Sequence, residues 1–234
     1  MSQKIKTKHI GIVGCSAEGA ALCYTTLCTQ APKLMGPHAH PEVSMHTHSL
    51  ADYVTCLEAA DLDGVAALMH SSAEKLIGMG ADLLICPDNT IHQALGLIRE
   101  RISVPWLHIA EVVTLEAKRL GYQQPGILGT RWLVESSVYP NALEGQGLRW
   151  QKPNPVQTNL MSDIIMDELV CGTFNESSTS QLIDIIDDLK DRDCDAVILG
   201  CTELPLVLND DNSLLPTLNS NRLLAEAALR AALN

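Results

Sequence analysis

Two side chains in this 234-residue sequence combine a proton-transferring type with a position at the end of an apolar run. Asp88 follows the run 81–87, and Cys201 follows the run 196–200. A thiol at a strand end can act as a base when backbone N–H groups lower its pKa, and a carboxylate can do the same work. Each also has a structural interpretation, because Asp is a common helix N-cap and most single cysteines are inert. The sequence therefore nominates these two residues for proton transfer and leaves both alternatives open.

The elements that would position them alternate between strands and helices. Apolar segments typical of strands cover 9–14, 43–48, 81–87 and 104–109, and helical spacing covers 17–30, 61–79, 91–101 and 221–234. Such alternation predicts an α/β fold in which short parallel sheets are flanked by helices.

The second half of the chain repeats the first. Segment 11–14 matches 126–129, segment 82–89 matches 195–202, and segment 104–108 matches 215–219, at separations of 115, 113 and 111 residues. Three matches in one order indicate two copies of one unit. We therefore expect two pseudo-symmetric lobes, residues 1–112 with 221–234 and residues 113–220. Ligands of parallel α/β units bind outside the carboxyl ends of strands, which predicts an active site in the cleft between the lobes, with Asp88 opposite Cys201.

Composition excludes several classes of protein. The formal net charge is -12 and no basic block occurs, which argues against a nucleic-acid partner. No apolar run approaches the roughly 18 residues of a membrane span, and residues 1–6 lack the apolar core of a signal peptide. Several of the eight cysteines lie in apolar runs, among them Cys86, which we assign to the core. These features predict a reduced, cytoplasmic protein.

Polar groups also follow the first strand of each repeat. Arg131 and Thr130 follow segment 126–129, where they could hold a carboxylate, although a surface arginine is equally plausible. Ser16 stands at the matching turn of the first copy and could donate in the same way. That turn, 14–19, lacks the middle glycine of the dinucleotide-binding fingerprint, so no cofactor is predicted.

The histidines offer a weaker signal. His38 with His40 and His46 with His48 form two His-x-His pairs, but no carboxylate or cysteine stands at a confirming spacing, so no metal site is predicted. His92 would lie one helical turn from Asp88 and could bond to it or to a ligand, or be a structural histidine.

These motifs together resemble the aspartate/glutamate racemase family, which includes hydantoin racemases, maleate isomerases and relatives of arylmalonate decarboxylase. The resemblance covers nearly the whole chain and is carried by residues 11–16, 89–92, 129–130, 199–205 and 221–225. It implies a cofactor-independent isomerase with two α/β lobes, in which a pair of cysteines acts on opposite faces of a carbon acid. Cys201 matches the second cysteine, whereas Asp88 stands where the first would be.

The resemblance further implies that Asn89, Thr90, Thr130 and Thr202 donate to a substrate carboxylate. It also implies a small carboxylate or amino-acid substrate resembling aspartate or glutamate, and a homodimer. The unequal acid strengths of Asp88 and Cys201 keep other functions open. These are a one-base decarboxylase, a cis–trans isomerase of a small dicarboxylate, and a catalytically silent small-molecule binding protein.

Overall fold

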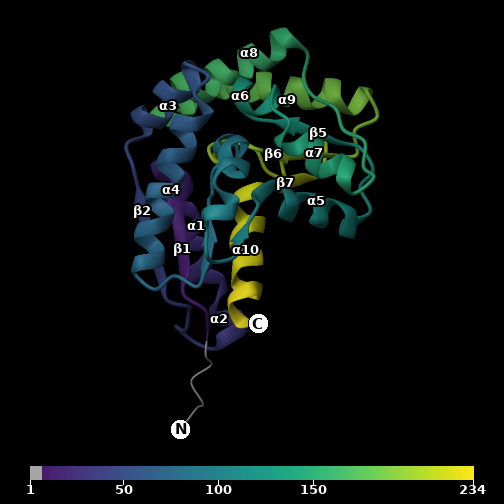
Figure 1. Cartoon of the computed structure of the whole chain (residues 1–234). Helices are drawn as coiled ribbons and strands as arrows, with labels where there is room; N and C mark the ends of the chain where they lie inside the picture. Colours follow the sequence, from purple (N-terminus) through teal and green to yellow (C-terminus); the bar gives the residue numbers. More distant parts are fainter. Residues whose placement is uncertain (1–6) are drawn as a thin grey trace. The chain divides into compact units, whose positions relative to one another are not determined.

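The computed structural model describes residues 7–234 and divides into two compact units. Unit 1 is Met1–Ile109 with Asn221–Asn234, and unit 2 is Ala110–Ser220. Each unit contains its own parallel sheet flanked by helices, which confirms the predicted α/β class (Figure 1). The expected boundary between the two lobes, at residues 112 and 113, stays a prediction. The expected lack of a signal peptide concerns residues 1–6, which lie outside the described part of the chain.

The sheet of unit 1 is parallel throughout and has the strand order β2-β1-β3-β4. Its strands are β1 (Ile10–Gly14), β2 (Val43–Thr47), β3 (Leu83–Ile85) and β4 (Trp106–Leu107). Its helical segments are α1 (Ala17–Gln30), α2 (Pro32–Met35), α3 (Leu50–Glu58), α4 (Leu62–Gly78), the 3-10 helices η1 (Thr90–Leu97) and η2 (Arg99–Arg101), and α10 (Ser220–Leu233). All residues of β1 and β3 are buried, so the central strands form the core of this unit.

Local signals explain where its helices begin and end. Ser16 accepts a hydrogen bond from Gly19 N and caps α1, and Asp61 accepts one from Gly64 N and caps α4. Gly80, with φ +93°, follows the end of α4 in a conformation that favours glycine.

The helix predicted over 91–101 is present as two 3-10 helices, η1 and η2. The buried side chains Ile91, Ala94 and Leu95 are followed by Gly96 and then by buried Ile98. Positions 91, 94, 95 and 98 follow the i, i+3, i+4, i+7 spacing of an α-helix, so the apolar spacing does not select the 3-10 form, whereas Gly96 lowers the propensity for an α-helix.

The C-terminal helix α10 belongs to unit 1. Lys8 N donates to Ala232 O at 2.9 Å, and Asn221 Nδ2 donates to Gly19 O at 2.8 Å. The chain therefore leaves unit 1 after Ile109 and returns to it at Asn221.

The sheet of unit 2 is also parallel and has the order β5-β6-β7. Its strands are β5 (Pro125–Leu128), β6 (Ala196–Leu199) and β7 (Thr217–Asn219). Its helical segments are α5 (Ile109–Leu120, whose first residue belongs to unit 1), α6 (Arg131–Val134), α7 (Val138–Gly145), α8 (Pro155–Asp163), the π-helix η3 (Ile164–Glu168), the 3-10 helices η4 (Leu169–Cys171) and η5 (Leu204–Leu206), and α9 (Glu176–Asp191). Gln151 forms an isolated parallel bridge to Gly126, on the side of β5 that corresponds to the position of β2 beside β1.

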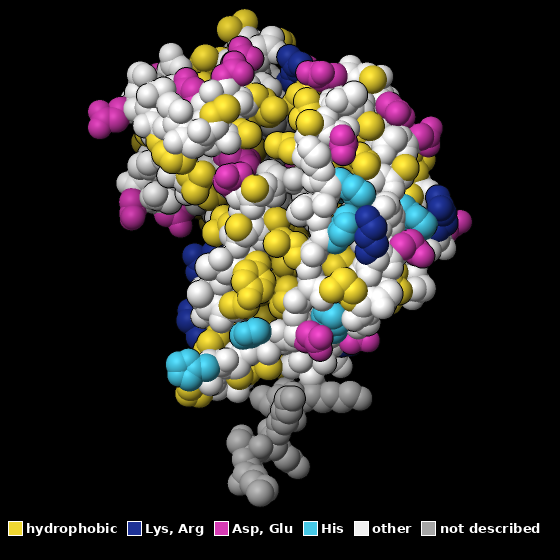
Figure 2. Space-filling model, turned by 90° about the vertical axis from the view of Figure 1, so that its left-hand side faces the viewer, with side chains coloured by type: hydrophobic (Ala, Val, Ile, Leu, Met, Phe, Trp, Pro, Cys, Tyr) yellow, Lys and Arg dark blue, Asp and Glu magenta, His cyan; other side chains and the backbone are white. Residues whose placement is uncertain are grey.

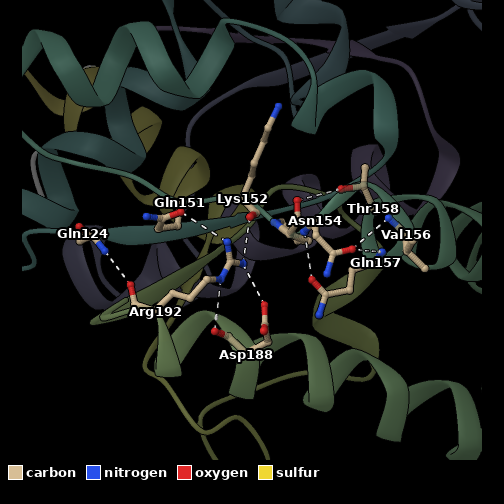
Figure 3. Close-up of polar contacts among 10 residues, drawn as sticks. Gln124, Gln151, Lys152, Asn154, Val156, Gln157, Thr158, Asp188 and Arg192 are labelled. Atoms are coloured by element: carbon tan, nitrogen blue, oxygen red, sulfur yellow. Dashed lines mark hydrogen bonds and ion pairs between the residues drawn. The ribbon is translucent and has the colours of Figure 1, made fainter.

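Arg192 fastens that bridge segment to the end of α9 (Figure 3). Its guanidinium donates to Lys152 O at 3.0 Å and forms an ion pair with Asp188 at 3.1 Å. Its own carbonyl accepts from Gln124 Nε2 at 2.9 Å. Just downstream, Asn154 forms a capping box at the start of α8. These contacts fix the edge of the sheet in unit 2.

The duplication is visible in hydrogen bonds as well as in strand order. Asp82 accepts from His9 N at 2.9 Å, and the equivalent Asp195 accepts from Gln123 N and Gln124 N. In return, Asp82 N donates to His9 O and Asp195 N donates to Gln124 O. An equivalent aspartate thus joins the beginnings of two paired strands in each unit, β1 and β3 in unit 1 and β5 and β6 in unit 2. Across residues 7–234, none of the helices has the length and apolar character needed to cross a bilayer.

Candidate active site

Asp88 lies at the carboxyl end of β3 and is half-buried. Its Oδ1 accepts from Ile91 N at 3.0 Å, so the side chain caps η1. Asp88 therefore caps a helix, as its structural interpretation predicted, and this hydrogen bond uses one of its two carboxylate oxygens. Because an ionised carboxylate is the stronger acceptor, the cap favours the charged form that a general base requires.

His92 holds the main chain of Asp88. Its Nδ1 lies 2.6 Å from Asp88 O, and its Nε2 accepts from Ile109 N at 3.4 Å. The ring is 3% exposed and packs against His108 at 4.6 Å between centroids. Burial, followed by the proximity of His108, lowers the pKa of His92 well below its usual value. His92 is thus a satisfied structural histidine bonded to the backbone of Asp88.

Cys86 is a core residue, as predicted. Its side chain is fully buried in the cluster that includes Tyr53 and Trp106. Burial, with a contribution from Asp88, raises the pKa of Cys86 well above its ordinary value. A thiol held in this neutral form cannot replace the cysteine that is absent at position 88.

The other predicted residues of unit 1 cluster around the same strand ends. Ser16 is buried at the start of α1, after β1, and β1 pairs directly with β3. Asn89 is buried and Thr90 is half-buried at the start of η1. Unit 1 therefore brings Ser16, Asn89 and Thr90 to the edge of the sheet that carries Asp88.

Cys201 lies at the equivalent edge of unit 2, just after β6. Its Sγ donates to Glu203 Oε2 at 2.8 Å, and Thr202 Oγ1 donates to the same oxygen at 2.9 Å. Glu203 is 2% exposed, and its Oε1 has no hydrogen-bond partner among residues 7–234. Burying an incompletely paired carboxyl group costs stability, so this cluster is a candidate for function. The hydroxyl hydrogen of Thr202, predicted to serve the substrate, is directed at Glu203 in this structure.

Gly200 allows the chain to pass close to β5 just before Cys201. A Cβ at this position would lie 2.6 Å from Leu128 O and 2.5 Å from Leu133 Cδ2. Gly200 N also donates to Leu128 O at 2.8 Å. Any larger residue would push the strand end away from its neighbour and displace Cys201 with it.

Thr130 and Arg131 lie after β5, which pairs with β6. Thr130 is buried at the start of the four-residue helix α6, and Arg131 N donates to Ser162 Oγ at 3.2 Å. The guanidinium of Arg131 is exposed and stacks over Trp132, 5.0 Å from the ring centroid. Its position at the strand edge agrees with a carboxylate-binding role, which stays a prediction.

The His-x-His pairs have other partners. His46 bonds to Ser72 and Lys75, and His48 bonds to Ser71, so this pair fastens β2 to α4. His40 Nδ1 contacts Pro41 O at 2.8 Å, and His38 adopts a positive φ of 63°. In the described part of the chain, no group of three or more His, Cys, Asp or Glu residues is arranged to hold a metal ion. On the face of the molecule drawn in Figure 2, histidine side chains lie beside Lys or Arg side chains.

Comparison with known proteins places this geometry in a family. The Asp/Glu/Hydantoin racemase family model matches residues 10–228. The chain belongs to this family. Its fold matches a crystal structure of a candidate Asp/Glu racemase from Yersinia pestis, with 25% identity, a TM-score of 0.89 and coverage of 97% of this chain and 100% of that one. An aspartate racemase homologue from Pyrococcus horikoshii matches with 23% identity, a TM-score of 0.83 and the same coverage, which shows the shared fold.

Curated relatives match over shorter stretches. A glutamate racemase from Persephonella marina is 27% identical over 151 residues, which cover 63% of this chain and 56% of that protein. The chain thus aligns with little more than half of that relative. A broad specificity amino-acid racemase from Bacillus subtilis is 26% identical over 178 residues, which cover 72% of this chain and 73% of that protein. The family fits the resemblance found in the sequence.

Sequence reasoning missed the role of Glu203. Its position two residues after a candidate cysteine, in a segment otherwise rich in apolar residues, was the available signal. Only the packing around η5 shows that this carboxylate is buried and that it accepts a hydrogen bond from the thiol.

Proposed function

We propose that this chain is a cofactor-independent amino-acid racemase in which Asp88 and Cys201 exchange protons on opposite faces of the α-carbon. The observation that carries this proposal is the hydrogen bond from the Cys201 thiol to buried Glu203, at the strand end equivalent to that of Asp88. A racemase must remove the α-proton from one face and return a proton to the other, so one group per face meets the requirement without rotation of the substrate.

The resting protonation states fit one direction of this reaction. Asp88 accepts a backbone N–H and serves as the base, while Cys201 carries the hydrogen that it donates to Glu203 and serves as the acid. Asp88 takes the α-proton, the electron pair of the C–H bond moves onto the α-carbon and its carboxylate, and Cys201 delivers its proton to the other face. In the reverse direction the Cys201 thiolate takes the α-proton, and the protonated Asp88 returns its proton to the other face.

Charge that develops on the substrate carboxylate requires donors. The family resemblance assigns this role to Asn89 and Thr90 in unit 1 and to Thr130 and Thr202 in unit 2. Their position after the first strand of each repeat nominates Ser16 and Arg131 for the same role. Donors aimed at developing charge supply much of the stabilisation in reactions of this kind. The resemblance also predicts an aspartate- or glutamate-like substrate, activity without pyridoxal phosphate, and a homodimer, and the composition predicts a cytoplasmic location. Sedimentation equilibrium of the purified protein tests the dimer.

The first experiment is incubation of the protein in D2O with each L- and D-amino acid, followed by NMR of the α-proton. Exchange with inversion supports the proposal and identifies the substrate. Exchange without inversion on every amino acid leaves a single working base, and no exchange on any amino acid rejects the racemase.

One observation favours a second function. A thiol that keeps its proton beside a carboxylate also suits one-sided protonation of a carbanion, as in decarboxylation of a small dicarboxylate. Release of CO2 from substituted malonates, together with no α-proton exchange on amino acids, would select this alternative. Replacement of Asp88 by Cys separates the two further: a racemase should retain or improve two-sided exchange, and an inactive, folded variant argues against the two-base mechanism.

A further inference from the structure

We infer that His92 is a positioning residue for Asp88, an inference that rests on the racemase function proposed above. Its two ring nitrogens have different partners, and these partners fix the tautomer. Asp88 O can only accept and Ile109 N can only donate, so Nδ1 carries the hydrogen and Nε2 is the acceptor. Protonation of Nε2 would place two donors face to face and would bury a charge beside His108. His92 is therefore neutral when it holds Asp88.

This contact determines the direction of the Asp88 side chain. The carbonyl of Asp88 is held by His92 and its Oδ1 by Ile91 N, so the residue is fixed at both its main chain and its side chain. With these two contacts in place, the second carboxylate oxygen has a defined direction. A misplacement of about 1 Å at a reacting group can lower the rate by about 100-fold. The contact at 2.6 Å should therefore affect proton transfer more than it affects stability.

The same ring also holds the point at which the chain leaves unit 1. Ile109 is the first residue of α5 and the last residue of this part of unit 1. His92 thus links the Asp88 turn to the beginning of α5. In unit 2 the position four residues after Cys201 is Pro205, whose side chain has no hydrogen-bond donor, where His92 stands four residues after Asp88. This way of positioning is specific to Asp88. The carboxylate of Asp88 is bonded to a backbone N–H, whereas the thiol of Cys201 is bonded to a second acid, Glu203.

Two substitutions separate the two hydrogen bonds. The amide nitrogen of asparagine lies close to the place of Nδ1, so His92→Asn keeps the donor to Asp88 O and loses the bond to Ile109 N. The amide oxygen of glutamine reaches the place of Nε2, so His92→Gln keeps the acceptor for Ile109 N and loses the bond to Asp88. We expect His92→Asn to retain kcat/KM within about threefold, and His92→Gln to lower it about 10- to 100-fold.

Isotope effects distinguish positioning from general damage. A racemase has an equilibrium constant of one, so a change in kcat/KM is the same in both directions. When the step at Asp88 becomes slower, the α-deuterium isotope effect rises for the enantiomer whose hydrogen Asp88 removes and falls for the other one. We expect this opposite movement in His92→Gln alone. Isotope effects that move together, or a His92→Gln variant as active as the wild type, would overturn the inference.

His9→Asn is the matched control, because His9 is also buried in unit 1 but bonds to Ser44 at the opposite end of the sheet. It should leave both isotope effects unchanged. Nitrogen-15 NMR of the His92 ring provides a readout that needs no substrate. We expect hydrogen on Nδ1 and no titration in the pH range where a histidine ordinarily titrates, since burial lowers the pKa of this ring. Hydrogen on Nε2 would reject the inference. If the wild type racemises no amino acid, the proposed function fails, while the NMR result still decides the His92 geometry.

Discussion

The ends of β3 and β6 occupy equivalent places in the two units but hold Asp88 and Cys201, the two residues proposed for proton transfer, by different means. Asp88 is held at its carboxylate by the backbone N–H of Ile91 and at its carbonyl by the imidazole ring of His92. Cys201 is held by another side chain, the carboxylate of Glu203. The comparison teaches that a duplicated framework can preserve the position of a reacting group while the chemistry of that group and its support diverge.

The difference has an energetic cost for a two-base reaction. The reference pKa values of Asp and Cys are about 3.9 and 8.5, and this gap corresponds to about 6 kcal/mol. The hydrogen bonds of Asp88 and Cys201 affect this difference in pKa. The N–H of Ile91 stabilises the charged carboxylate of Asp88, whereas a carboxylate beside the sulfur of Cys201 disfavours the thiolate. Both contacts therefore favour Asp88 as the base and Cys201 as the acid.

The strongest test of this comparison removes the thiol. We expect Cys201→Ser to reduce racemisation by about 1000-fold or more, because a serine hydroxyl is a far weaker proton-transfer group than a thiol. Chiral chromatography of the products measures the loss. Cys171→Ser, at an exposed cysteine of the same unit, should retain full activity. Equal losses in both variants would remove Cys201 from the mechanism.

Replacement of the carboxylate tests the other side. We expect Asp88→Asn to reduce racemisation by about 100-fold while the protein stays folded, because the amide oxygen can still accept from Ile91 N. Asp88→Ala loses the cap as well and should be less stable by about 1 kcal/mol. Chemical denaturation with urea separates the two effects. An Asp88→Asn variant with wild-type activity would show that Asp88 is only an N-cap.

The charge of Glu203 should control the reactivity of the thiol. We expect Glu203→Gln to increase alkylation of Cys201 by iodoacetamide at pH 7.5 by about tenfold, because loss of a negative charge 2.8 Å from the sulfur favours the thiolate. Peptide mass spectrometry resolves Cys201 from the other cysteines. Glu176→Gln, at an exposed acid in unit 2, is the control. Slower alkylation in Glu203→Gln would mean that Glu203 promotes ionisation of the thiol.

The two units should also differ in their response to acid. All eight histidines of the sequence lie in unit 1. Burial lowers the pKa of His92 in the folded state, so the unfolded chain binds a proton first as the pH falls below about 6.5. The stability that neutral His92 supplies is complete above that pH and declines below it by up to about 1.4 kcal/mol per pH unit. Hydrogen exchange at pH 7.5 and 5.5, corrected for intrinsic rates, should show weakened protection in unit 1 and not in unit 2, and His92→Asn should reduce the difference.

The smallest effect concerns the aspartates shared by both units. Asp195 accepts from two backbone N–H groups and Asp82 from one. We expect Asp195→Ala to destabilise the protein by about 1 kcal/mol more than Asp82→Ala does, as measured by urea unfolding. Equal losses would indicate that one hydrogen bond per unit supplies the stabilisation.

The sequence alone determined the α/β class, the duplication and the strand ends at which Asp88 and Cys201 lie. These features depend on short-range patterns, because a buried parallel strand needs a continuous apolar run and a repeated unit repeats that run. The starts of α1 and α4 were also readable, since Ser16 and Asp61 act on backbone N–H groups three residues away.

Only the tertiary structure decided what each group touches. Whether segment 90–101 forms an α-helix or 3-10 helices depended on how its apolar side chains pack, which lies beyond local propensity. The attachment of His46 and His48 to serines of α4 joins residues more than twenty positions apart in the chain. The state of His92 depended on Ile109, seventeen residues away, and on burial that no local pattern specifies. Hydrogen-bond partners and desolvation set the protonation of a side chain, and both arise only when distant segments pack together.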